Sequence, residues 1–341
     1  MARVSDLGID LGTSTVLIYQ KGKGIVLRQP AVVSIERTTK KVLAVGTEAH
    51  KMIGRTPGNV LAIRPLRQGV VSDFELTNTM LRNFMSIIIG KRFFSRPRVV
   101  LSVPTGVSES EKSNIVSILY DAGAKRTQLL ERPIAAAMGV GMDFRKPYGC
   151  MIVDMGAGVT DIAVLASGQV IEAASVCYGG DYFDDAIIRY LRKKHNLLIG
   201  ERSAEELKIT IGSAIAPTGG MTCEVTGRCL LSGLPKTQTI HAEEVHEAIK
   251  DAVADLIEAI QTVLERTPPQ LASDIFEDGI VLTGGAASLA GLPEAIYNTL
   301  HTPCGVADDP QTSVVLGCGR VLDDYSAYKG ILTDSRRGFG R

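Results

Sequence analysis

Residues 7–15 read Leu7-Gly8-Ile9-Asp10-Leu11-Gly12-Thr13-Ser14-Thr15, an apolar run that ends in an aspartate and continues into a glycine turn with hydroxyl side chains. A second copy of this pattern, Ile152-Val153-Asp154-Met155-Gly156-Ala157-Gly158-Val159-Thr160-Asp161, lies in the second half of the chain. A short apolar run bounded by glycines is typical of a buried strand. We therefore predict two buried strands, each followed by a tight turn, at equivalent places in two related halves.

Each of these turns combines groups that suit a phosphate and its counter-ion. Glycine lets the backbone approach an anion closely, and successive N–H groups in such a turn form an anion-binding concavity. The aspartate at the end of each strand, Asp10 or Asp154, is a hard oxygen ligand of the kind that Mg²⁺ takes, usually through water. Two such turns predict that the chain binds the phosphates of a Mg²⁺-nucleotide.

Length and composition restrict the class of protein. At 341 residues the chain exceeds the size at which one hydrophobic core stops growing, so two domains are expected. Lysine plus arginine equals aspartate plus glutamate at 37 each, which gives no global field that would attract nucleic acid. The six cysteines show no CxxC spacing, and no apolar run reaches the roughly 20 residues of a membrane span. These features predict a cytoplasmic globular protein that does not bind nucleic acid.

Strand and helix patterns alternate in both halves of the chain, which indicates an α/β architecture. In the first half Ser108-x-x-Glu111 matches a helix capping box, and in the second half Ser203-x-x-Glu206 matches another. We predict a first lobe over residues 1–147, a second lobe over residues 148–330 and a flexible tail over residues 331–341.

Three motifs resemble the phosphate and adenosine turns of the actin-like ATPase superfamily. They are Ile9-Asp10-Leu11-Gly12-Thr13, Val153-Asp154-Met155-Gly156-Ala157-Gly158 and Leu282-Thr283-Gly284-Gly285. Further segments resemble the MreB family of bacterial actin relatives in particular, among them Met52-Ile53-Gly54-Arg55-Thr56-Pro57-Gly58-Asn59 and Thr267-Pro268-Pro269-Gln270-Leu271. The resemblance covers nearly the whole chain.

This resemblance implies an actin-like fold of two lobes, each with a mixed twisted sheet flanked by helices, and a nucleotide in the cleft between them. It implies ATP and Mg²⁺ as cofactors, with the ion held through water by Asp10 and Asp154. The nucleotide-binding residues that it implies are Thr13, Ser14, Thr15, Gly156, Ala157, Gly158, Glu205, Glu206, Lys208, Gly284, Gly285 and Ala286. Residue types alone leave Glu205 and Lys208 undecided, because an exposed ion pair on one helical face has the same spacing.

The resemblance also implies a cytoskeletal protein that forms membrane-associated filaments and directs cell shape and cell-wall synthesis. The expected partners are further copies of the chain in paired protofilaments, the inner face of the cytoplasmic membrane, and the membrane proteins of cell-wall elongation. The expected location is therefore cytoplasmic and peripheral on the inner face of the cell membrane. A helix that begins near Glu109 would pair the protofilaments, and its apolar positions are Ile115, Val116, Ile118 and Leu119.

Two adjacent phenylalanines, Phe93 and Phe94, lie with four basic residues in a predicted loop at residues 90–98. Paired aromatic rings beside cations suit insertion at an anionic membrane surface, where basic groups meet phosphate and the rings are buried. The same composition also fits two rings that pack into the edge of the domain. The loop matches the position of the hydrophobic membrane loop of the MreB family, which favours membrane contact.

One position departs from the family pattern. Family members carry a glutamate directly before a proline, and that glutamate positions or polarises the attacking water; here Arg132 stands in this hydrolytic position, in Glu131-Arg132-Pro133. Arginine stays protonated and accepts no hydrogen bond, so it cannot act as the base. Glu131 is a poor substitute, because adjacent residues of an extended segment point to opposite faces. Arg132 would instead stabilise phosphate charge, and we expect tight ATP binding with slow hydrolysis.

Three functions stay open on the sequence. The first is an ATP-binding filament protein of the MreB type. The second is a nonhydrolysing or slowly hydrolysing paralogue that acts as a scaffold or regulator of filaments, which Arg132 favours. The third is a sugar-kinase-type enzyme on the same fold, which would need a carboxylate base and larger insertions for a sugar pocket. The chain contains no candidate insertion, and whether it is an enzyme depends on the effect of Arg132.

Overall fold

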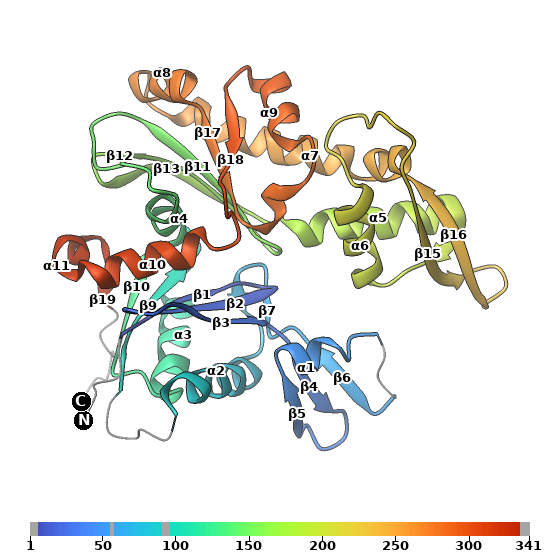
Figure 1. Ribbon diagram of the computed structural model, residues 1–341, viewed down its shortest axis with the longest axis horizontal. Coiled ribbons are helices and arrows are strands. Elements are labelled where there is room, and N and C mark those ends of the chain that lie inside the picture. Colours follow the sequence, from blue (N-terminus) through green and yellow to red (C-terminus); the bar gives the residue numbers. More distant parts are fainter. Residues whose placement is uncertain (1–5, 55–57, 91–95, 335–341) are drawn as a thin grey trace. The chain divides into compact units, whose positions relative to one another are not determined.

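The computed structural model describes residues 6–54, 58–90 and 96–334, in which strands and helices alternate as predicted (Figure 1). Contacts between Cα atoms divide the chain into two compact units. Unit 1 comprises residues 1–147, 167–170 and 311–341, and unit 2 comprises residues 148–166 and 171–310. Each unit has its own hydrophobic core. In the described part of the chain no helix is both long enough and apolar enough to span a membrane.

The main sheet of unit 1 is an antiparallel meander extended by parallel strands, in the order β19-β10-β9-β1-β2-β3. The meander consists of β1 (Leu7–Leu11), β2 (Thr15–Gln20) and β3 (Gly24–Pro30). Parallel to β1 run β9 (Arg98–Val103) and β10 (Arg126–Glu131). The other elements of unit 1 are β4 (Val33–Glu36), β5 (Val42–Val45), α1 (Thr47–His50), β6 (Val60–Ile63), β7 (Leu66–Arg67), β8 (Val70–Val71), α2 (Phe74–Ile89), α3 (Glu109–Asp121), α4 (Arg132–Val140), α10 (Ser313–Asp323), α11 (Tyr325–Tyr328), η2 (Lys329–Ile331) and β19 (Thr333–Asp334).

Alternation along β1 decides which helices cover each face of this sheet. Leu7 and Ile9 lie in one core cluster with the buried residues of α2 and α3. Gly8 faces the other way, because a Cβ atom added to it would lie 2.8 Å from the Cβ atom of Cys318 on α10. Successive side chains of a strand point to opposite faces, so α10 covers one face of the sheet and α2 and α3 cover the other (Figure 1).

The C-terminal helix α10 belongs to unit 1, so the prediction that residues 311–330 are part of the second lobe is wrong. Helices α10 and α4 touch backbone to backbone at two glycines. A Cβ atom at Gly139 would come within 1.7 Å of the carbonyl oxygen of Ser313, and one at Gly317 within 1.8 Å of that of Ala135. The close packing of these small residues fixes α10 on unit 1.

The predicted flexible tail begins too early in the sequence. Residues 333–334 form β19, which pairs with β10. The side chain of Asp334 accepts a hydrogen bond from Nε2 of Gln128 at 2.7 Å and forms an ion pair with Arg126 at 2.5 Å. These contacts make residues 333–334 the edge of the sheet, and residues 335–341 lie outside the described residues.

Unit 2 repeats the sheet of unit 1, in the order β13-β12-β11-β17-β18. Its meander consists of β11 (Cys150–Met155), β12 (Thr160–Ala166) and β13 (Gln169–Val176). Parallel to β11 run β17 (Ile280–Thr283) and β18 (Cys304–Val306). In both units the parallel strands lie beside the first strand of the meander, so the internal repeat indicated by the two turns extends to the sheets.

The remaining elements of unit 2 are mostly helical. They are α5 (Gly180–His195), β14 (Leu197–Leu198), α6 (Glu201–Ile211), β15 (Thr222–Cys229), β16 (Pro235–His241), α7 (Ala242–Arg266), α8 (Pro269–Asp278), η1 (Gly285–Ser288) and α9 (Leu292–Leu300).

One of the two predicted capping boxes is confirmed, and the other is wrong. Ser108 caps α3, and the Glu111 side chain bonds back to the Ser108 backbone. Helix α6, however, begins at Glu201 with Gly200 as its N-cap, so Ser203 lies inside the first turn. Glycine is an acceptable N-cap, and the helix can therefore start one turn before the serine.

Candidate functional site

The two predicted phosphate turns are closed by the same hydrogen bond in both units. The N–H of Gly12 donates to the carbonyl of Thr15 at 3.1 Å, and the N–H of Gly156 donates to the carbonyl of Val159 at 2.9 Å. Each bond closes the turn of an antiparallel hairpin, β1–β2 or β11–β12. A Cβ atom at Gly12 would lie 2.7 Å from the carbonyl oxygen of Thr15, which makes glycine necessary there. The prediction of two equivalent strand–turn–strand segments is confirmed.

The turn of unit 1 is anchored to its surroundings by the residues predicted to bind phosphate. The Oγ1 atom of Thr13 accepts a hydrogen bond from the N–H of Gly69 at 3.1 Å, and the carbonyl of Ser14 accepts one from Ala31 at 2.8 Å. A hydroxyl that accepts one bond can still donate its own hydrogen, so Thr13 keeps a donor for a phosphate oxygen. The side chains of Ser14 and Thr15 are half-buried.

Asp10, near the end of β1, has a cation beside it. The hydroxyl of Ser102 donates to Oδ1 of Asp10 at 2.8 Å, and Nε of Arg132 lies 3.9 Å from the same oxygen. The Arg132 side chain is only 6% exposed, whereas its neighbour Glu131 is exposed, which agrees with the predicted opposite orientation. The side chain at the predicted hydrolytic position is therefore a buried guanidinium that faces the first aspartate.

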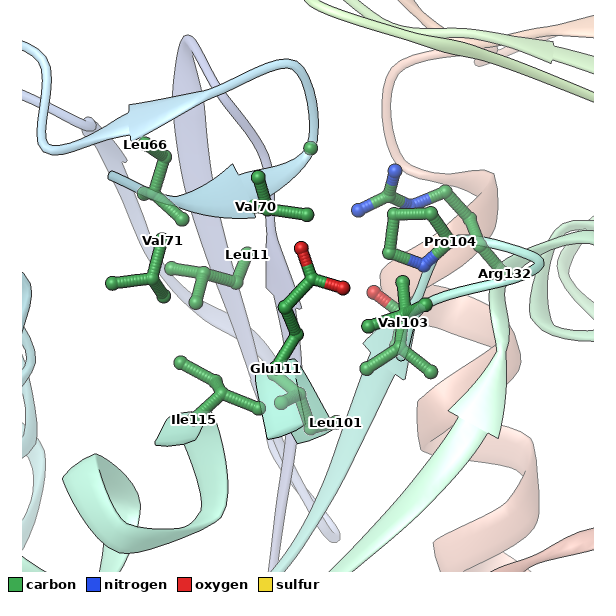
Figure 2. A pocket seen from close by; sticks show the side chains of 13 residues that line it. Leu11, Leu66, Val70, Val71, Leu101, Val103, Pro104, Glu111, Ile115 and Arg132 are labelled. Carbon is green, nitrogen blue, oxygen red and sulfur yellow. The ribbon is translucent and has the colours of Figure 1, made fainter. Parts of the chain in front are cut away.

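Arg132 also lines a small pocket of unit 1, about 30 Å³ in volume. Figure 2 shows its guanidinium and the Glu111 carboxylate pointing into this pocket from α4 and α3, with Val70 and Pro104 beside them. Such a volume holds about one or two water molecules, which is far too little for a nucleotide. The Glu111 carboxylate accepts bonds from the hydroxyl and the N–H of Ser108 at 2.6 and 2.9 Å, and these bonds hold the pKa of Glu111 below its usual range.

In unit 2, three of the predicted segments meet at Gly180, the first residue of α5. A Cβ atom at Gly180 would lie 3.2 Å from Nζ of Lys208, 3.6 Å from Cα of Ala157 and 3.8 Å from Cβ of Ala286. The N–H of Gly180 also donates to the carbonyl of Gly156 at 3.0 Å. The second phosphate turn, the turn after β17 and the helix α6 are thus brought together within this unit.

Lys208 is held by Asp184, a residue that no motif indicates. Its Nζ atom lies 2.8 Å from Oδ1 of Asp184 and donates to the carbonyl of Gly180 at 2.9 Å. Burial raises the pKa of Asp184 to about 6, although the positive charge of Lys208 opposes the rise. The buried pair therefore fixes Lys208 beside the second phosphate turn.

The two glutamates predicted on α6 have different surroundings. Glu205 is half-buried, and its charge contributes to the raised pKa of Asp184. Glu206 is exposed, and its Oε1 atom lies 3.0 Å from Nε of Arg202. Because Lys208 pairs with Asp184, the simple surface pair between Glu205 and Lys208 that the spacing allowed is not what the structure shows.

We expect Lys208→Met to destabilise the protein at pH 7.5 by about 3 kcal/mol, because the Asp184 carboxylate then lies buried without its cation. The pKa of Asp184 in the folded protein, about 6, lies above its ordinary value of 3.8. The protonated carboxyl therefore favours the folded state; this stabilisation is full at low pH and is lost as the pH rises through 6. At pH 5 the Asp184 carboxyl is largely protonated and needs no cation, so Lys208→Met should reduce the free energy of unfolding by less than it does at pH 7.5.

Urea unfolding at pH 7.5 and pH 5 measures this difference. Lys250→Met is the matched control, because Lys250 forms an exposed pair with Glu247. An equal loss of stability at both pH values in Lys208→Met would contradict the assignment of the buried pair.

The role of Asp10 toward Mg²⁺, held through water, stays a prediction. In the described ranges no group of three or more His, Cys, Asp or Glu side chains could hold a metal ion. At Asp10 a guanidinium already lies against the carboxylate, and a divalent cation placed there would be repelled by it. Asp154 is buried opposite Asp161 across the β11–β12 hairpin, and its role toward Mg²⁺ stays a prediction.

Two predicted interaction sites have different outcomes. Phe93 and Phe94 lie outside the described residues. The apolar residues of α3 face the core of unit 1, and these are Ile115, Val116, Ile118 and Leu119. A protofilament contact through α3 would therefore have to use its polar face.

Sequence reasoning missed Ser102 and Asp184. Ser102 lies at the end of β9, a strand that runs parallel to β1, which brings its hydroxyl to Asp10. Asp184 lies one turn into α5 and reaches Lys208 on α6. The only signal for Ser102 was a small polar residue at the end of an otherwise apolar strand, and Asp184 gave none.

Comparisons with known proteins agree with this architecture. The MreB/Mbl protein family model matches residues 4–330. The chain is 46% identical over 319 residues to the cell shape-determining protein Mbl of Bacillus cereus, covering 94% of this chain and 96% of that protein. It is 42% identical over 333 residues to the cell shape-determining protein MreB of Escherichia coli, covering 96% of each.

Solved structures show the same fold. MreB5 of Spiroplasma citri bound to ADP matches with a TM-score of 0.90 at 31% identity, covering 96% of this chain and 98% of that one. The same protein bound to AMPPNP gives 0.91 at 30% identity, covering 97% and 99%. These matches confirm the predicted actin-like α/β fold and leave the sugar-kinase alternative without support. The chain therefore belongs to the MreB/Mbl family of actin-like cytoskeletal proteins that determine cell shape.

Proposed function

We propose that this chain is an ATP-binding, filament-forming member of the family that hydrolyses ATP slowly. The observation that carries the proposal is the pair of equivalent phosphate turns, combined with the buried Arg132 in the hydrolytic position. Structures of the relative MreB5 contain ADP and AMPPNP, which supports binding of an adenine nucleotide. A MamK double helical filament has the same fold, with a TM-score of 0.79 at 22% identity over 94% of this chain and 98% of that one.

The residues proposed to bind the nucleotide are those that the sequence motifs indicate. The residues are Thr13, Ser14 and Thr15 in unit 1, and Gly156, Ala157, Gly158, Glu205, Glu206, Lys208, Gly284, Gly285 and Ala286 in unit 2. The geometry of the turn after β17 explains why it contains Gly284. Gly284 has a φ of 83°, and a Cβ atom there would lie 2.3 Å from the carbonyl oxygen of Met155. Only glycine lets this turn pack against the end of β11.

Slow hydrolysis follows from the chemistry of the hydrolytic position. A guanidinium has no lone pair to accept a proton or to orient water, and Glu131 is exposed on the other side of the chain. This supports the scaffold alternative, in which filaments persist while ATP is present. Arg132 would instead bind phosphate charge.

Sedimentation with ATP and with AMPPNP tests the polymer. We expect filaments to pellet in both nucleotides and to persist in ATP, because slow hydrolysis leaves the nucleotide unchanged. Loss of the pellet with time in ATP alone would favour a hydrolysing filament. Absence of a pellet under both conditions would contradict filament formation.

A pair of variants tests where the filament contact lies: one changes an exposed apolar turn, and the other is its control. The turn between β15 and β16 exposes Leu231 and Leu234 at 81% and 65%, and exposed apolar residues grouped in this way are typical of contact surfaces. Leu231→Ser combined with Leu234→Ser should reduce the pellet. Phe276→Ser, at an exposed residue of α8, should leave it unchanged.

The proposed location is the inner face of the cytoplasmic membrane, where the chain would work with membrane proteins of cell-wall elongation. Phe93 and Phe94, with the basic residues around them, are the proposed contact. We expect Phe93→Ser combined with Phe94→Ser to weaken binding to anionic liposomes by about tenfold or more, because the double variant has no aromatic rings at these positions to insert into the lipid. Co-sedimentation measures this, again with Phe276→Ser as control. Unchanged binding would locate the contact elsewhere.

A further inference from the structure

We propose that Arg132 takes the place of a divalent cation at Asp10, so that ATP binding by this chain depends little on Mg²⁺. The inference rests on the proposed ATP binding and identifies what neutralises the negative charge at the first phosphate turn. It concerns residues that all belong to unit 1.

The two side chains are close together; that of Arg132 is buried and that of Asp10 is half-buried. Nε of Arg132 lies 3.9 Å from Oδ1 of Asp10, and the side chains are 6% and 16% exposed. An arginine guanidinium is a permanent cation at neutral pH. Burial holds this charge in place, as a bound ion would be held, and the Ser102 hydroxyl at 2.8 Å fixes the same carboxylate oxygen.

The position of Arg132 in its helix adds to the positive charge. Arg132 is the first residue of α4, whose first turn contains no acidic residue and whose N-cap, the exposed Glu131, makes no side-chain cap hydrogen bond. The N-terminus of a helix carries partial positive charge, so a cation there is unfavourable unless an anion lies nearby. Asp10 is such an anion, and it lies two residues before Gly12 of the first phosphate turn. A fixed cation, the Arg132 guanidinium, is thus part of unit 1 near that turn.

A carboxylate in the same place would have the opposite effect. With glutamate at the hydrolytic position, two carboxylates would face each other where a carboxylate and a guanidinium face each other now. Two carboxylates at this separation repel each other and attract a divalent cation. In the natural chain the guanidinium already offsets the Asp10 charge, so a divalent cation gains less there, and a phosphate oxygen can accept hydrogen bonds from the guanidinium.

The test is the dissociation constant for ATP, measured by calorimetry on the full chain in Mg²⁺ and in EDTA. For the natural chain we expect the two values to agree within about threefold, whereas Arg132→Glu should bind about tenfold or more weakly in EDTA than in Mg²⁺. Arg82→Gln is the matched control and should behave like the natural chain. Arg82 is an exposed residue of α2 whose Nε donates to the carbonyl of Asp121 at 3.0 Å.

Asp10→Asn gives a second test, because the two possible roles of Asp10 predict opposite changes in ATP affinity. If Arg132 is the counter-ion, removing the Asp10 charge takes away repulsion toward phosphate, and ATP should bind at least as tightly as before. A loss of about tenfold in Mg²⁺ would indicate that Asp10 holds a metal ion, and would overturn the inference.

The outcomes separate this inference from the proposed function. A natural chain that binds ATP in Mg²⁺ but about tenfold or more weakly in EDTA would overturn the role of Arg132 and leave ATP binding intact. A natural chain that binds no ATP under either condition would overturn both. The comparison on the natural chain needs no variant, so it holds even if Arg132→Glu folds poorly.

Discussion

Exchange of Arg132 for glutamate is expected to raise the rate of ATP hydrolysis by about 100-fold or more, which is the usual contribution of a positioned general base. In the natural chain the side chain at the predicted hydrolytic position is the buried guanidinium of Arg132, whose Nε lies 3.9 Å from Oδ1 of Asp10. It donates hydrogen bonds and accepts none, so it can attract the phosphates but cannot orient the attacking water. A carboxylate supplies the missing acceptor.

Phosphate release at saturating ATP and Mg²⁺ measures the rate. Arg82→Glu, with the same change of charge on the surface of α2, is the control and should stay as slow as the natural chain. Arg132→Lys should also stay slow, because it keeps a cation in place. Equally fast release from the natural chain and from Arg132→Glu would contradict slow hydrolysis as a property of this protein.

Alanine at the two glycines between α4 and α10 is expected to destabilise the folded protein strongly. The added Cβ atom would lie 1.7 Å from the carbonyl oxygen of Ser313 in Gly139→Ala, and 1.8 Å from that of Ala135 in Gly317→Ala. Alanine gains about 1 kcal/mol over glycine in a helix interior. Overpacking of this severity costs about 3 kcal/mol or more, so the net effect is destabilising.

Urea unfolding measures the change. Gly330→Ala is the matched control in the same unit, because a Cβ atom there would meet nothing within 4 Å. If Gly139→Ala and Gly317→Ala were neutral or stabilising, α10 would not pack on α4, and the place of the C-terminal segment in unit 1 would be wrong.

The parts of the fold that sequence predicts are those set by neighbouring residues. The bond from Gly12 to Thr15 closes within four residues, and so does the bond from Gly156 to Val159, so a short motif contains all that each turn requires. The same holds for the capping box at Ser108, whose partners are three residues apart. Such patterns place strands, turns and helix starts, and through the repeat they also indicate two related units.

The parts that sequence could not predict depend on residues far apart in the chain. The position of α10 depends on Gly139 meeting Ser313, and neither residue belongs to a motif. Ser102 reaches Asp10 only because β9 pairs with β1, and Asp184 reaches Lys208 only because α5 packs beside α6. The substitution at Arg132 was visible in the sequence, but its contact with Asp10 was not.

A crystal structure of the chain with ATP and Mg²⁺ would decide between the two roles of Asp10, because it shows which cation lies beside that carboxylate. We predict that the Arg132 guanidinium stays beside the Asp10 carboxylate, within hydrogen-bond distance of a phosphate oxygen, and that no metal ion is held by Asp10. A hydrated metal ion at Asp10, with the Arg132 side chain turned away from the phosphates, would contradict it.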